Sequence, residues 1–140
     1  MTATVERTTP RASVVALTVL AALVAVGVVT SLIAFVALTA GVGDGFPPLQ
    51  PQAYLSFALA GTLIALGGWV LIVRFVRRSA RLLKVLVPGL FVVTLIPDVV
   101  LLVTGFIPGA TPGAVIALML MHPVVAGAAV LAGQRIAPAR

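Results

Sequence analysis

The sequence predicts an all-α membrane protein, a transmembrane four-helix bundle with both termini on the cytoplasmic side (N-in/C-in). Hydrophobic residues make up 61% of the 140 residues and charged residues only 9%, whereas soluble domains contain about 25% charged residues. Four apolar stretches each reach the length of about 20 residues that a helix needs to cross a bilayer. We therefore expect one integral membrane domain over residues 1–140, with no soluble part.

The apolar stretches define the expected membrane spans, and proline and glycine define where they end. We place the spans at residues 13–41, 53–73, 84–107 and 112–133. The first is longer than the apolar core of a signal peptide, about 7 to 15 residues, so we expect it to remain as a span. The segments 43–51 and 108–113 are rich in Pro and Gly, which remove backbone donors and permit positive φ, so helices end there.

The positive charges predict the orientation of the chain. The nine cations are Arg7, Arg11, Arg74, Arg77, Arg78, Arg81, Lys84, Arg135 and Arg140. They lie in the two terminal tails and in the connection between the second and third spans, and the two Pro/Gly-rich loops contain none. Because Lys and Arg in short loops stay on the cytoplasmic side, we expect a multi-pass protein of a bacterial cytoplasmic membrane. Tyr54 and Trp69, near opposite ends of the second span, are expected to lie in interfacial aromatic belts.

The basic connection between the second and third spans also allows an interpretation as a lipid-headgroup site, because cations beside a membrane attract anionic lipids. Orientation of the chain explains the same cluster, and we favour that explanation. Nucleic acid is not an expected partner despite the net charge of +6, because the sequence contains no base-reading fold.

Asp98 and His122 are the strongly polar residues inside the apolar stretches, and both lie twelve residues from Ala110 in the turn between their helices. A helix rises about 1.5 Å per residue, so two antiparallel helices would bring both side chains to one depth, near the middle of a ~30 Å hydrocarbon layer. An ionisable residue there is costly and is a functional-site hypothesis by default. We therefore predict that Asp98 and His122 meet and form a catalytic acid/base pair.

A structural tether between two helices is the competing interpretation of this pair. Interhelical polar contacts in membranes average only about 0.6 kcal/mol, which makes the pair a poor substitute for apolar packing, so we favour a functional role. Pro97 and Pro123 adjoin the pair and remove backbone hydrogen bonds, which would either open a cavity or merely kink the helices. Residues at a similar depth are expected to line the site. These ligand-binding candidates are Thr30, Ser31, Thr62, Thr94 and Met119.

The expected function is binding of a small apolar or lipid-like molecule at the bilayer midplane, with proton transfer of the isomerase or cyclase type. The alternatives are a small transporter or proton-coupled accessory subunit, and a structural subunit of a larger membrane complex. With one His and no Cys, we expect no metal site and no cofactor. The expected partners are membrane lipids and further copies of the chain, because small residues give the fourth span a surface for close helix contact. That surface consists of Ala126, Gly127, Ala128, Ala129, Ala132 and Gly133.

Two segments of the second half carry a resemblance. They are Leu95-Ile96-Pro97-Asp98-Val99-Val100-Leu101-Leu102 and Met119-Leu120-Met121-His122-Pro123-Val124-Val125, and the basic connection precedes them. With this spacing the chain resembles an uncharacterised family of small four-span actinobacterial integral membrane proteins. The resemblance implies the four-span fold, and it implies no substrate or activity.

Overall fold

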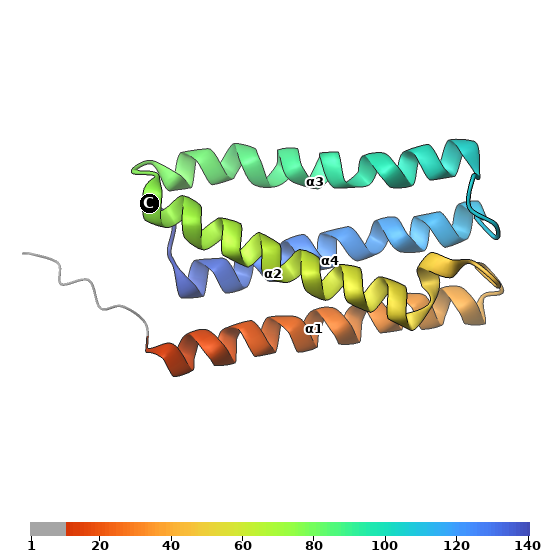
Figure 1. Ribbon diagram of the computed structural model, residues 1–140, viewed down its shortest axis with the longest axis horizontal. Helices are drawn as coiled ribbons and strands as arrows, with labels where there is room; N and C mark the ends of the chain where they lie inside the picture. The colour runs from red at the N-terminus through yellow and green to blue at the C-terminus, as the bar shows by residue number, and fades with distance from the viewer. Residues whose placement is uncertain (1–10) are drawn as a thin grey trace, which may run out of the picture.

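The protein is a bundle of four long helices, described by a computed structural model over residues 11–140 (Figure 1). The helices are α1 (Ala12–Thr39), α2 (Pro51–Phe75), α3 (Ser79–Thr104) and α4 (Pro112–Ile136), with a short 3-10 helix η1 (Pro47–Leu49) before α2. All four are long and apolar enough to cross a membrane. The all-α prediction is thus confirmed, and the chain is a four-span membrane protein. Arg7, one of the cations used to predict orientation, lies outside the described residues.

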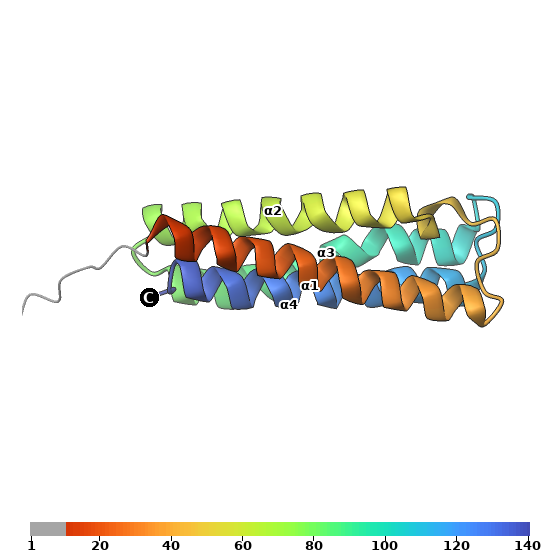
Figure 2. The ribbon, with the colours of Figure 1, turned by 90° about the horizontal axis from the view of Figure 1, so that it is seen from below.

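The two ends of the bundle differ in chemistry. The α1–α2 and α3–α4 loops lie together at one end, and the α2–α3 turn lies at the other with the start of α1 and the end of α4 (Figure 2). We call these the loop end and the cationic end. The basic connection is shorter than the sequence suggested, because Arg74 belongs to the last turn of α2 while Arg81 and Lys84 belong to the start of α3. Long basic side chains can reach water from terminal helical turns, so helix continues through them.

Proline, threonine and glycine set the helix boundaries at the loop end. Pro51 and Pro112 occupy first helical positions, where a missing N–H costs no hydrogen bond. The hydroxyl of Thr111 accepts a hydrogen bond of 3.2 Å from the N–H of Ala114 and so caps α4. Gly105 ends α3 with φ at 59°, a left-handed conformation that favours glycine.

Helix α4 is the centre of the bundle and packs against α1, α2 and α3. Helix α1 presents a narrow stripe of mostly small residues, which allows close approach of helices where apolar side chains gain little by leaving lipid. The buried stripe of α1 is Ala22, Val26, Thr30, Ala34 and Ala37. We expected the small residues of α4 at contacts between copies of the chain. Three of them, Ala129, Ala132 and Gly133, are instead buried by contacts within a single copy.

Packing is concentrated at the loop end. The larger buried cluster, which we call the loop-end cluster, consists of Ala34, Ala37, Phe46, Leu49, Tyr54, Leu101, Ala114, Val115, Ala117 and Met121. The smaller cluster contains only Ala22, Leu66 and Ala132. Helices α3 and α4 lie close at the loop end and diverge toward the cationic end (Figure 1). Only four residues of α3 are buried, namely Ser79, Leu83, Asp98 and Leu101.

The two aromatic residues assigned to interfacial belts are instead buried inside the bundle, so that prediction was wrong. The Nε1–H of Trp69 donates a 2.9 Å hydrogen bond to the carbonyl of Ala137, and its ring lies over Gly133. The hydroxyl of Tyr54 donates to Ser31 Oγ at 3.2 Å. Each polar tip has a protein partner, which allows burial of the ring.

Gly133→Ala is expected to destabilise the cationic end by about 1–3 kcal/mol, the usual cost of overpacking. A Cβ at this position would lie 2.6 Å from Cδ2 of Trp69, and the flat ring offers no flexible end that could move aside. The loss should appear as a lower apparent melting temperature of the detergent-extracted protein. The matched control is Gly127→Ala in the same helix, where an added Cβ meets nothing within 4 Å. Equal melting temperatures for the two variants would contradict the tight contact with Trp69.

Candidate functional site

The side chains of Asp98 of α3 and His122 of α4 meet inside the bundle, as the sequence predicted. Asp98 Oδ2 lies 3.3 Å from His122 Nδ1. The side chain of Asp98 is 12% exposed and that of His122 is 27% exposed, so the carboxylate is the more enclosed group. Because the α3–α4 loop connects these helices, equal distance along the chain from the loop brings the two residues to one level.

The proton on the imidazole ring has a defined place in this geometry. His122 Nδ1 faces two acceptors, Asp98 Oδ2 at 3.3 Å and the carbonyl oxygen of Leu118 at 3.1 Å. A neutral imidazole carries one N–H, so the tautomer protonated at Nδ1 fits this surrounding. Among the described residues, Asp98 Oδ2 is buried and has no hydrogen-bond partner of good geometry. The carboxylate is thus incompletely satisfied, and Nε2 of the ring keeps a free lone pair.

Proline adjoins each member of the pair, and both helices continue through it. Pro97 lies inside α3 and Pro123 inside α4. Neither proline has an N–H, so the carbonyls of Val93 and Met119 lose the donor four residues further along. Neither Asp98 nor His122 lines the groove between α1 and α2 or the cavity at the cationic end, both of which are described below. The prolines therefore supply two backbone acceptors near the pair.

The buried threonines expected to line the site satisfy their own helices. Thr30 and Thr62 are fully buried, and each hydroxyl donates a 2.7 Å hydrogen bond to a carbonyl four residues earlier in the same helix. In an apolar surrounding this local bond is the nearest available acceptor. Neither hydroxyl bonds to another helix among the described residues, and the expected role of the two threonines in ligand binding stays a prediction.

The other expected ligand residues lie in three different surroundings. Thr94 donates to the carbonyl of Phe91 at 2.7 Å. It shares the helix face of Asp98 but is exposed, because it lies on the side of Asp98 toward which α3 and α4 diverge (Figure 1). Ser31 accepts the Tyr54 hydrogen bond between α1 and α2. Met119 is half-buried against the loop-end cluster. The structure thus brings together Asp98 and His122, whereas Thr94 is exposed one turn before Asp98 and Ser31 contacts Tyr54.

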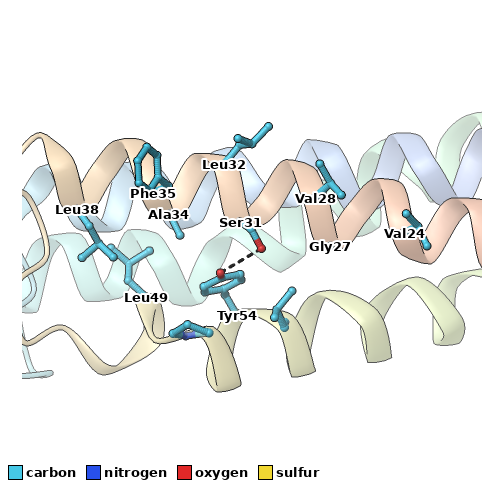
Figure 3. A pocket seen from close by; sticks show the side chains of 12 residues that line it. Val24, Gly27, Val28, Ser31, Leu32, Ala34, Phe35, Leu38, Leu49 and Tyr54 are labelled. Atoms are coloured by element: carbon cyan, nitrogen blue, oxygen red, sulfur yellow. Dashed lines mark hydrogen bonds between the residues drawn. The ribbon is translucent and has the colours of Figure 1, made fainter.

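A groove between α1 and α2 was not expected from the sequence. Figure 3 shows Ser31 and Tyr54 meeting within it, and its volume is about 810 Å³. Its walls are otherwise apolar, formed by residues such as Val28 and Leu55. The available sequence signal was the run of small residues Gly27, Ser31 and Ala34, whose spacing places them on one face of α1.

The Asp98–His122 pair offers groups for proton exchange and hydrogen bonding. In residues 11–140 no group of three or more His, Cys, Asp or Glu side chains could hold a metal ion. The Asp98–His122 pair combines a carboxyl group with an imidazole, an arrangement in which an ionised carboxylate orients the ring and stabilises the imidazolium form.

Comparison with known proteins yields one match. No curated protein and no solved structure matches the chain. A family described as a family of unknown function, DUF6069, matches residues 7–139, which include all four helices and the Asp98–His122 pair. The chain therefore belongs to the DUF6069 family.

Proposed function

We propose that this protein binds a small apolar or lipid-like molecule within the membrane and exchanges a proton with it through His122. The observation that carries the proposal is the incompletely satisfied Asp98 carboxylate, buried 3.3 Å from an imidazole whose other nitrogen is free. A buried polar atom without a partner is destabilising, and a role in catalysis is one of the reasons for which a protein keeps such an atom. We also infer that the cationic end faces the cytoplasm.

The proposed chemistry assigns one role to each member of the pair. His122 Nε2 accepts a proton from the ligand, and the resulting imidazolium is stabilised by the adjacent Asp98 carboxylate. The same proton then returns to another atom of the ligand. One bond to hydrogen breaks and one forms, so an isomerisation of this kind requires no oxidant, reductant or cofactor. The His122 side chain is 27% exposed, and we propose that a ligand in the lipid reaches the ring from its exposed side.

A structural tether is the second candidate, and the position of α3 favours it. Asp98 is one of only four buried residues in this helix, so the contact with His122 provides a substantial part of what holds α3 against α4. In this case the pair would determine helix packing without binding a ligand.

Native mass spectrometry of the gently extracted protein distinguishes the two functions. We expect the wild-type protein to carry a bound small molecule, and Asp98→Asn and His122→Gln to lose it. Their apparent melting temperatures should change little, because interhelical polar contacts contribute only about 0.6 kcal/mol on average. Thr104→Val is the control on α3, since this exposed hydroxyl donates only to the carbonyl of Val100.

Two outcomes would contradict ligand binding. A wild-type protein without any bound molecule would do so directly. Variants that retain the bound mass but melt at much lower temperatures than Thr104→Val would identify the pair as a tether.

A further inference from the structure

We propose that a cavity at the cationic end binds the headgroup of an anionic phospholipid. The cavity has a volume of about 290 Å³ and lies between α2, α3, α4 and the segment after α4. We call it the cationic-end cavity. Its lining consists of Trp69, Ala80, Leu83, Lys84, Val87, Pro88, Val130, Gln134 and Ala139. Neither Asp98 nor His122 contributes to it, so this site goes beyond the proposed function and is independent of it.

The cavity exists because two helices separate. Beyond Leu83, the next buried residue of α3 is Asp98, fifteen residues further along the helix on the way to the loop end. Over this interval α4 diverges from α3, as Figure 1 shows. Pro88 lies on the cavity wall within the same interval. The cavity therefore opens at the cationic end, where the smaller of the two buried clusters lies.

Charge complementarity identifies the class of ligand. Every described cation lies at this end of the bundle, whereas the described acidic side chains, Asp44 and Asp98, lie in the α1–α2 loop and in the second half of α3. Lys84 forms part of the cavity wall itself. Basic pockets between membrane helices bind anionic lipid headgroups. A ligand that is anionic at one end and apolar beyond it fits a cavity with one cation and walls such as Leu83 and Val130.

The polar groups of the lining favour a headgroup that contains hydroxyls. Gln134 Oε1 accepts a hydrogen bond of 3.3 Å from the N–H of Ala139, which leaves the amide NH₂ to donate to a phosphate oxygen. Because Pro88 has no N–H, the carbonyl of Lys84 lacks its helical donor and can accept from a hydroxyl. Phosphatidylglycerol offers both phosphate oxygens and hydroxyls, whereas the trimethylammonium group of phosphatidylcholine has no hydrogen-bond donor.

The start of α3 does not contribute to this recognition. The N–H of Ala80 already donates to the carbonyl oxygen of Arg140 at 2.8 Å, and the N–H of Arg140 donates to Ser79 Oγ at 3.1 Å. The backbone at the start of α3 is thus already hydrogen-bonded to Arg140. Binding of the headgroup therefore depends on Lys84 and Gln134.

Native mass spectrometry with defined lipids tests this site. The protein is delipidated in detergent and given equal amounts of phosphatidylglycerol and phosphatidylcholine. We expect the wild-type protein to retain phosphatidylglycerol preferentially, and Lys84→Gln to bind it about fivefold more weakly, the effect of about 1 kcal/mol for one cation. Arg77→Gln removes the same charge from the α2–α3 turn outside the cavity and should weaken binding less than Lys84→Gln.

A second variant separates the cavity from the surface charge. Val130→Trp fills the cavity without changing any charge and should displace the lipid, while size-exclusion chromatography verifies that the variant remains folded. Equal losses in Lys84→Gln and Arg77→Gln would overturn the proposal and indicate diffuse attraction. Full retention of phosphatidylglycerol by folded Val130→Trp would also overturn it. Ligand loss in Asp98→Asn does not enter this test, so the two proposals fail separately.

Discussion

Phe46→Ala is expected to lower the free energy of unfolding by about 3–5 kcal/mol, the range for truncation of a buried phenylalanine. Phe46 is 1% exposed although it lies in the loop between α1 and α2. Its ring belongs to the loop-end cluster, where it is one of the two largest members together with Tyr54. Removal of the ring would leave a void at the point where both loops close the bundle.

The measurement is the apparent melting temperature in detergent, with Phe57→Ala as the matched control. Phe57 is 79% exposed on α2, so its truncation removes the same side chain without making a cavity. Phe46→Leu, which keeps most of the volume, should lose less than about 1.5 kcal/mol. If Phe46→Ala and Phe57→Ala melt at the same temperature, the loop does not stabilise the bundle.

Gly109→Ala should have the next largest effect, because two separate costs act at this position. Its φ of 79° lies in the left-handed region, where a side chain costs about 1–2 kcal/mol. An added Cβ would also lie 3.0 Å from the backbone nitrogen of Phe46 and 3.0 Å from the carbonyl carbon of Gly45. Backbone atoms of a closed loop cannot move aside easily, so overpacking adds about 1–3 kcal/mol.

Gly105→Ala separates these two costs. Gly105 has a φ of 59°, and a Cβ there would meet nothing within 4 Å, so only the backbone cost applies. We expect both variants to melt below the wild-type protein and Gly109→Ala to melt lowest. A Gly109→Ala protein as stable as Gly105→Ala would show that the two loops do not touch as tightly as described.

The sequence was sufficient to predict that Asp98 and His122 meet, and insufficient to predict most of their surroundings. Their meeting follows from helical rise and from the turn at Ala110, both of which can be counted along the chain. Which way each helix faces could not be counted, because in a membrane span every face is apolar. Nor could the point at which α3 separates from α4, which leaves Thr94 exposed although it shares the helix face of the buried Asp98.

Contacts between distant parts of the chain were also beyond prediction from the sequence. The packing of Trp69 on Gly133 requires knowledge of how α2 crosses α4, and that crossing is fixed by the shapes of many side chains together. Trp69 therefore resembled an interfacial anchor in the sequence. The same reasoning applies to Phe46, which has the sequence surroundings of a loop residue and the burial of a core residue.

The central position of α4 has a consequence for the biogenesis of the protein. Helices α1, α2 and α3 precede α4 in the chain, yet each of them packs against it. During translation the first three helices are synthesised before their common partner. Completion of the bundle must therefore wait for α4, and until α4 packs against α3, Asp98 has no contact with His122.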